Sequence, residues 1–100
     1  MNKLSMILTK DELDRIKIAK NNSEICMDLH KLTARQAKRL VSNLIALNRT
    51  SFSLRLIHGY NHGTAIKEML WNKFDNDRLK ERKTVENNPG QTIFVIKETA

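Results

Sequence analysis

The chain has 100 residues, of which 40% are hydrophobic and 29% are charged, a composition that indicates one globular domain and excludes a disordered or fibrous chain. Its 18 lysines and arginines outnumber its 11 acidic residues, and the resulting formal charge of +7 favours a polyanionic partner such as nucleic acid. One cysteine, Cys26, excludes an internal disulfide, and no apolar run reaches transmembrane length. We therefore expect a cytoplasmic domain with no membrane partner and no signal peptide.

The N-terminal segment contains a helix signal. Thr9 and Glu12 have the spacing of a capping box, which predicts a helix that starts there and continues to about Lys20. Its apolar stripe is thin. We therefore expect residues 1–22 to form a helical extension and residues 23–100 to form the domain itself.

A strand and a helix follow. Residues 24–30 alternate as a strand does, which places Ile25, Met27 and Leu29 inward and turns Cys26, Asp28 and His30 to the other side. A second capping box at Thr33 predicts a helix to about Leu47. The apolar stripe of this helix, at i, i+3, i+4 spacing, consists of Ala37, Leu40, Val41, Leu44 and Ile45.

The same sequence of elements then repeats. Residues 52–58 predict a second strand, and the loop over 59–64 leads to a helix over 65–74, with Thr64 as its N-cap. Trp71 lies at the margin of the apolar stripe of this helix, where a packed edge residue is expected in preference to a base-stacking platform.

The C-terminal part predicts two strands. Residues 79–85 are highly charged and fit an edge strand, residues 87–90 fit a turn, and residues 92–97 are apolar on both sides, as in an interior strand. The expected order is an N-terminal helix followed by βαβαββ. Two helices on one face of a mixed four-stranded sheet form a two-layer α/β sandwich.

The two apolar strands that flank the first long helix should be parallel and should end at the same edge of the sheet, where open α/β sheets usually bind ligands. Asp28, His30 and His58 could therefore share one site. A carboxylate beside an imidazole orients the ring and could support acid–base chemistry. The alternative is structural, with Asp28 accepting backbone N–H groups, and taken alone the pair favours it. A divalent metal ion stays open as a cofactor, because three ligands at a fixed spacing are not evident.

The loop after the second strand has features of a phosphate site. Gly59 and Gly63 give the backbone freedom, Asn61 tolerates positive φ, and the helix that starts near Thr64 would point its first N–H groups at an anion. The alternative is an ordinary tight connection. The side chains expected beside this loop or at the helix starts are His62, Lys31, Arg35 and Lys67.

The segment from Ile25 to Glu98 resembles the Smr domain, the small MutS-related domain. The first signature of that family is Leu-Asp-Leu-His-Gly, and this chain reads Met-Asp-Leu-His-Lys over 27–31. The second is Ile-His-Gly-x-Gly-x-Gly, and this chain reads Ile-His-Gly-Tyr-Asn-His-Gly over 57–63. Lys31 and Asn61 thus stand where the family has glycine. Asn-Asn-Pro-Gly over 87–90 replaces a glycine-rich turn before the last strand.

The resemblance implies a fold similar to the C-terminal domain of translation initiation factor three, DNA or RNA binding and, for many members, endonuclease or nicking activity. We therefore expect Asp28 and His30 to position or activate water, and His58 to act as acid, base or phosphate ligand. Two alternatives remain, a non-catalytic nucleic-acid-binding module and a protein-interaction domain whose basic charge is incidental. The choice of DNA or RNA, metal dependence and oligomeric state are left open.

Overall fold

The computed structural model describes residues 9–18, 23–59 and 64–99. The described elements are α2 (Lys10–Asp14), β1 (Ile16–Ile18), β2 (Glu24–Asp28), α3 (Ala34–Leu47), β3 (Phe52–Ile57), α4 (Thr64–Glu68), the π-helix η1 (Met69–Lys73), β4 (Leu79–Val85) and β5 (Asn88–Ile96). None of the helices in these ranges is long and apolar enough to cross a membrane.

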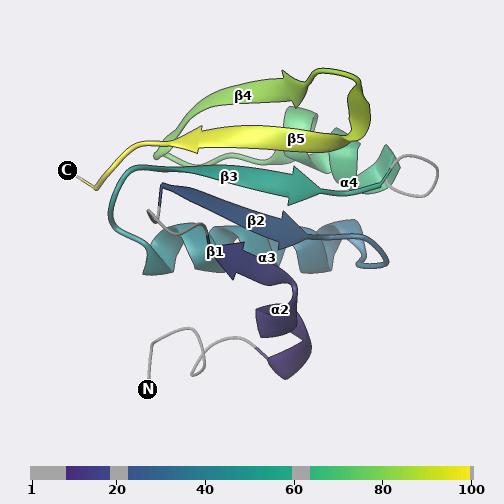
Figure 1. The fold of residues 1–100 in the computed structure, drawn as a ribbon, viewed down its shortest axis with the longest axis horizontal. Helices are drawn as coiled ribbons and strands as arrows, with labels where there is room; N and C mark the ends of the chain where they lie inside the picture. Colours follow the sequence, from purple (N-terminus) through teal and green to yellow (C-terminus); the bar gives the residue numbers. More distant parts are fainter. Residues whose placement is uncertain (1–8, 19–22, 60–63, 100) are drawn as a thin grey trace.

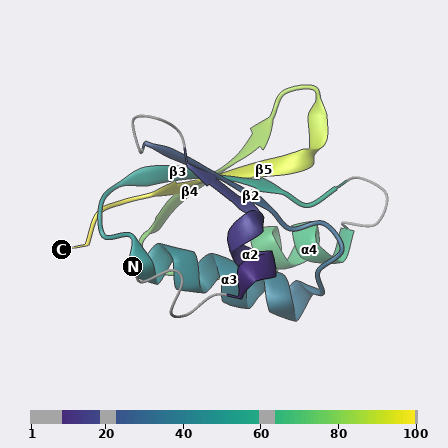
Figure 2. The same ribbon diagram turned by 60° about the horizontal axis from the view of Figure 1, so that its bottom comes forward.

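The five strands form one mixed sheet in the order β1-β2-β3-β5-β4. β2 and β3 are parallel, and the other neighbours are antiparallel. Helices α3 and α4 cover the same face of the sheet (Figures 1 and 2). The predicted α/β sandwich with a mixed sheet is confirmed, and β4 and β5 take the predicted edge and interior positions. The sheet has five strands where four were expected.

The additional strand comes from the segment predicted to be helical up to Lys20. The capping box of Thr9 and Glu12 is present, but the helix ends at Asp14, and Ile16–Ile18 pair with β2. The N–H of Asp28 donates to the carbonyl of Arg15 at 2.9 Å, which begins this pairing. Pairing with β1 satisfies the backbone groups at the outer edge of β2. The thin apolar stripe of a longer helix would have offered little surface to bury in its place.

The core lies between the sheet and the two helices. The alternation predicted for the first strand is confirmed, because Ile25, Met27 and Leu29 are buried. The predicted stripe of α3 is buried in full. The other core side chains come from β3, the α4–η1 segment and β5: Phe52, Leu54, Leu56, Ile66, Met69, Leu70, Phe74, Phe94 and Ile96.

The helix expected over 65–74 is divided in two. It begins at Thr64 itself, which is therefore the first helical residue, and it changes to a π-helix at Met69. The N–H of Phe74 reaches the carbonyl of Met69 at 2.7 Å, five residues earlier. The guanidinium of Arg82 donates to the carbonyls of Leu70 and Phe74, at 2.7 and 2.5 Å, and so satisfies groups at the end of this helix.

The turn before the last strand is displaced from its predicted place. It consists of Glu86 and Asn87, and Asn87 has a φ of 60°, whereas Asn88 and Gly90 already belong to β5. Asparagine is one of the few residues that adopt this left-handed conformation readily. The longer β5 brings Gly90 to the start of the loop after β3, where its carbonyl accepts from the N–H groups of His58 and Gly59.

Candidate functional site

Asp28 and His30 form a close pair at the end of β2. Oδ1 of Asp28 lies 2.5 Å from Nδ1 of His30 and 3.1 Å from the His30 backbone N. The prediction that the two side chains point the same way and meet is therefore confirmed. Because a carboxylate on Nδ1 favours the tautomer that carries its proton there, Nε2 is left as the proton acceptor. Within the described ranges, Nε2 of His30 has no hydrogen-bond partner, and the side chain is half exposed.

The backbone of this pair is held by Arg15. Its NH1 donates to the carbonyls of Asp28 and His30, at 3.1 and 2.8 Å, and its Nε bonds the carboxylate of Asp11 at 3.0 Å. Arg15 follows α2 directly, so the N-terminal segment supports the candidate site. The helix predicted from the sequence includes Arg15, and nothing local in the sequence indicates this role.

A small cavity of about 230 Å³ lies beside Asp28 on the uncovered face of the sheet. It is lined by residues of the α2–β1 segment and of β2 and β3: Asp14, Arg15, Lys17, Cys26, Asp28 and Ile57. Lys17 and Arg15 bring positive charge to this cavity, and Asp14 and Asp28 bring negative charge. Cys26 is partly buried, and burial raises the pKa of its thiol more than the nearby charge of Arg55 lowers it. The thiol is therefore protonated at neutral pH.

The pKa of the Asp28 carboxyl lies below its ordinary value of 3.8. Partial burial alone would raise it, but the hydrogen bonds from the His30 ring and backbone N–H, together with the charges of His30 and Arg15, have the larger combined effect. Asp28 is therefore a carboxylate at neutral pH, as an orienting partner of an imidazole must be.

The structure does not bring His58 together with this pair. β2 and β3 do end at the same edge, because Asp28 lies opposite Ile57. The side chain of His58, however, follows the inward alternation of β3 and is 1% exposed. It lies on the helix-covered face, whereas Asp28 lines the cavity on the other face. The expectation that Asp28, His30 and His58 form one catalytic cluster is therefore wrong. Asp28 lies opposite Ile57, and His58 is the next residue along the chain, so its side chain points to the other face of the sheet.

Both ring nitrogens of His58 have partners inside the protein. Nδ1 lies 2.9 Å from the Gly59 carbonyl, which can only accept, so Nδ1 carries the proton. Nε2 lies 2.9 Å from Oγ1 of the buried Thr92 and accepts from that hydroxyl. Thr92 Oγ1 in turn accepts from Nε1 of Trp71 at 3.1 Å. The chain Trp71–Thr92–His58–Gly59 is thus a fully satisfied network that fixes the start of the loop.

The pKa of His58 is lowered from its ordinary value of 6.5. Burial is the main cause, the hydrogen bond to Gly59 opposes it, and the nearby charge of Lys67 adds to it. His58 is therefore neutral at pH 7 and has no free nitrogen. It acts as a positioning residue for the loop and does not provide a second acid or base. Thr92, its partner, was not identified in the sequence because nothing local marks it.

The predicted phosphate loop is described only at its ends. Gly59 has a φ of 87°, a conformation that favours glycine, and Thr64 is exposed at the start of α4. Asn61, His62 and Gly63 lie outside the described residues. The prediction that they contact phosphate stays a prediction.

Lys31 follows His30 directly and has a φ of 69°, the left-handed region that glycine adopts at least cost. Its backbone thus keeps the conformation that a glycine would supply, and its side chain is exposed. Arg35, in the first turn of α3, and Lys67 of α4 are also exposed. Both helices start at the edge where β2 and β3 end (Figure 1), which is the edge where these three residues were expected. That they contact phosphate stays a prediction.

Several arginines of this basic chain serve the fold. Arg39 pairs with the buried Glu12 at 2.6 Å, and Arg55 pairs with Glu24 at 2.8 Å. Arg78 and Arg82 bind backbone carbonyls. The exposed cations that form no ion pair with a described carboxylate are Lys10, Lys17, Lys31, Arg35, Lys38, Arg49, Lys67, Lys73, Lys80, Lys83 and Lys97. The positive charge is therefore carried mainly by free surface lysines.

Within the part of the chain that the structure describes, no three His, Cys, Asp or Glu side chains gather as metal ligands would. Comparisons of the chain with protein-family models, with curated proteins and with solved structures gave no match. The resemblance to the Smr domain therefore stays a prediction from the two sequence motifs.

Proposed function

We propose that this protein binds nucleic acid at the edge where β2 and β3 end and hydrolyses a phosphodiester bond there, as an endonuclease on DNA or RNA. The observation that carries the proposal is the Asp28–His30 pair, in which the carboxylate occupies Nδ1 and leaves Nε2 of a half-exposed imidazole without a described partner. A base of this kind can take a proton from an attacking water.

The proposed chemistry needs few groups. Asp28 holds the imidazole, Nε2 of His30 takes a proton from water, and the water oxygen bonds to phosphorus as the P–O ester bond breaks. The departing oxygen is protonated by the imidazolium or by solvent. Lys17 and Arg15, which line the cavity beside Asp28, would stabilise the negative charge that develops on the phosphate.

Two further observations support nucleic acid as the partner. The formal charge of +7 suits a polyanion, and the exposed Lys31 and Arg35 follow the end of β2 at this edge. The motifs over 27–31 and 57–63 resemble those of the Smr domain. The single cysteine fits the reducing environment of the cytoplasm, which is where we propose that the protein works.

A cleavage assay tests the proposal. Wild type and Asp28→Asn are incubated with supercoiled plasmid and with structured RNA, while binding is measured by fluorescence anisotropy. We expect nicking or cleavage by wild type, loss of about 100-fold or more of the rate in the variant, and similar binding by both. Equal cleavage by the two proteins would overturn the catalytic assignment. A chelator added to the same reactions decides whether cleavage needs a divalent metal ion.

One observation favours a second function, a nucleic-acid-binding module without catalysis. His58 is buried, neutral and hydrogen-bonded at both ring nitrogens. The edge therefore provides one imidazole for acid–base chemistry, that of His30, whereas the two motifs imply two. The same assay separates the two functions, since the module predicts binding without cleavage by either protein.

A further inference from the structure

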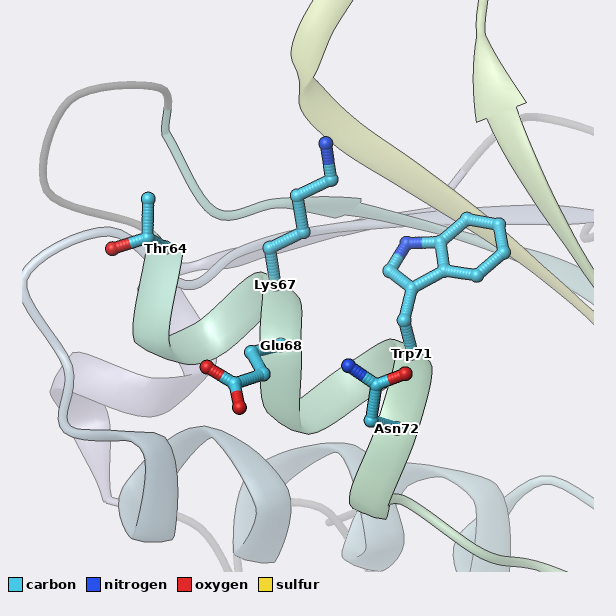
Figure 3. Close-up of a pocket in the computed structure, with 5 residues that line it drawn as sticks. All are labelled: Thr64, Lys67, Glu68, Trp71 and Asn72. Atoms are coloured by element: carbon cyan, nitrogen blue, oxygen red, sulfur yellow. The ribbon is translucent and has the colours of Figure 1, made fainter.

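Trp71 presents part of its indole to solvent in a shallow pocket on the outer face of α4 and η1. The pocket has a volume of about 260 Å³ and is lined by Thr64, Lys67, Glu68, Trp71 and Asn72. Figure 3 shows the indole lying against β5, with a broad side of the ring turned to the viewer, and Lys67 extending beside it. Trp71 is only half-buried. It packs at the edge of the core as expected, but part of its ring is also accessible to solvent.

The ring is held in place by its polar atom. Nε1 of Trp71 donates to Oγ1 of Thr92 at 3.1 Å, and Thr92 is fixed by its hydrogen bond to His58. The indole N–H is therefore already satisfied, and the exposed part of the side chain can offer only its π-face. A fixed, flat aromatic face loses little conformational entropy when another ring stacks on it.

The π-helix contributes to this placement. Residue 71 lies in the middle of the π-turn Met69–Lys73, whose wider backbone is satisfied at its end by Arg82. Such turns in otherwise α-helical segments occur frequently at functional sites.

The charge beside the ring selects the ligand. Lys67 is exposed and forms no ion pair with any carboxylate in ranges 9–18, 23–59 and 64–99. An aromatic face beside a free ammonium fits an unstacked base whose adjoining phosphate contacts the cation. Glu68 lines the other side of the pocket and would repel phosphate, so the backbone is expected on the Lys67 side.

We propose that this pocket binds single-stranded nucleic acid, with one base stacked on Trp71 and the neighbouring phosphate on Lys67. The inference rests on the proposed function, because it names the form of nucleic acid that the protein recognises. It differs from that function in location, since the pocket lies on the helix-covered side of the sheet and the Asp28–His30 pair belongs to the other face.

Because Trp71 is the single tryptophan of the chain, its fluorescence reports on this pocket alone. The full chain is titrated with a labelled single-stranded oligothymidylate of about ten nucleotides, and with an abasic oligomer of the same length and charge. Anisotropy of the label measures binding, and tryptophan emission measures stacking. We expect the thymidylate to quench emission and the abasic oligomer to bind more weakly without quenching.

Variants make the test specific. Trp71→Leu should weaken thymidylate binding about tenfold and leave abasic binding unchanged. Trp71→Phe, which keeps a ring, should lose less. Lys67→Gln should weaken binding of both oligomers more than the matched change Lys73→Gln, and Glu68→Gln should strengthen it. Urea unfolding of each variant establishes that the fold is kept.

The outcomes separate the two proposals. Binding of the thymidylate without quenching, and with equal affinity for wild type and Trp71→Phe or Trp71→Leu, would overturn the stacking site and leave the proposed function in place. Absence of oligomer binding by anisotropy at low salt would overturn the inference, and the proposed function would then be decided by binding to plasmid and structured RNA. Failure of the thymidylate to quench tryptophan emission would likewise overturn the inference.

Discussion

His58 illustrates how the surroundings of a residue decide its chemistry. Its ring nitrogens donate to Gly59 and accept from Thr92, and burial lowers its pKa. Because the folded pKa is below 6.5, the unfolded chain binds more protons in the window between the folded pKa and 6.5. The stabilisation from neutral His58 is complete above about 6.5 and is lost as the pH falls through that window.

We therefore predict that the free energy of unfolding of wild type decreases as the pH falls below about 6.5. In His58→Gln the decrease over the same pH range should be smaller. The other histidines are common to both proteins and cancel in the comparison. Urea unfolding at several pH values between about 5 and 8 measures the effect. Parallel pH dependences for the two proteins would show that His58 is not held neutral by the fold.

Lys31 gives a second prediction at the scale of one residue. Its φ of 69° is strained for a side chain with a Cβ, so Lys31→Gly should stabilise the protein, by about 0.5–1 kcal/mol. Lys38→Gly, at an exposed position within α3, is the matched control and should destabilise by about 1 kcal/mol. Urea unfolding measures both. A loss of stability in Lys31→Gly would mean that the lysine side chain makes a stabilising contact.

Among the elements, Arg78 joins the end of α3 to the end of β5. Its guanidinium donates to the carbonyls of Ile45, Asn48 and Thr50 on one side and Lys97 on the other, at 2.5 to 3.1 Å. Few side chains other than arginine can serve four carbonyls at once. Among the described residues no carboxylate pairs with Arg78, so the interaction is a cap of backbone groups.

Arg78→Lys should therefore destabilise the protein by about 2–4 kcal/mol, because one ammonium cannot reach all four carbonyls. Arg49→Lys, at an exposed position in the turn whose carbonyls Arg78 binds, should change stability by less than about 0.5 kcal/mol. Thermal or urea unfolding compares the two variants. If Arg78→Lys were as mild as its control, water would be replacing the guanidinium at these carbonyls.

The elements also show which patterns can be predicted from sequence. The 14 residues of α3 carry a complete stripe and a capping box, so its boundaries and buried positions were correct. The three residues of β1 are too short to carry a period, and they form a strand because the edge of β2 is open. The π-turn at Met69–Lys73 keeps the helical stripe of Met69, Leu70 and Phe74, so the sequence cannot distinguish it from an α-helix.

On the scale of the whole molecule, the sheet divides the predicted site between its two faces. Strand alternation was sufficient to predict that Asp28 and His30 meet, because they are two residues apart in sequence, although β2 ends at Asp28 and His30 lies in the turn that follows. The position of His58 required the pairing of β3 with β5, which brings Thr92 beside it, 34 residues away. The role of Arg15 was not predicted for the same reason, since its partners lie at the end of β2 and in the turn after it, 13 and 15 residues later.

The distribution of charge over the molecule predicts how binding responds to salt. Lys31 follows the end of β2, whereas Lys97 follows the end of β5, which pairs with the start of β3 at the opposite end of the strands. If phosphate contacts form at the edge where β2 and β3 end, Lys31→Gln should weaken duplex binding and reduce the slope of log K against log salt by about 0.9. Lys97→Gln should change neither. A slope equally affected by both changes would indicate binding that is not localised at the proposed edge.

The most direct test of the proposed catalytic site compares two histidines that the motifs treat alike. The single-turnover cleavage rate of a labelled substrate is measured at pH 7.5 with saturating wild type, His30→Gln or His58→Gln, after circular dichroism has established that each is folded. Removal of the half-exposed base should slow cleavage about 100-fold or more, whereas replacement of the buried, neutral His58 should cost less than about tenfold. Cleavage by His30→Gln at the wild-type rate, or a loss confined to His58→Gln, would contradict the assignment of hydrolysis to Asp28 and His30.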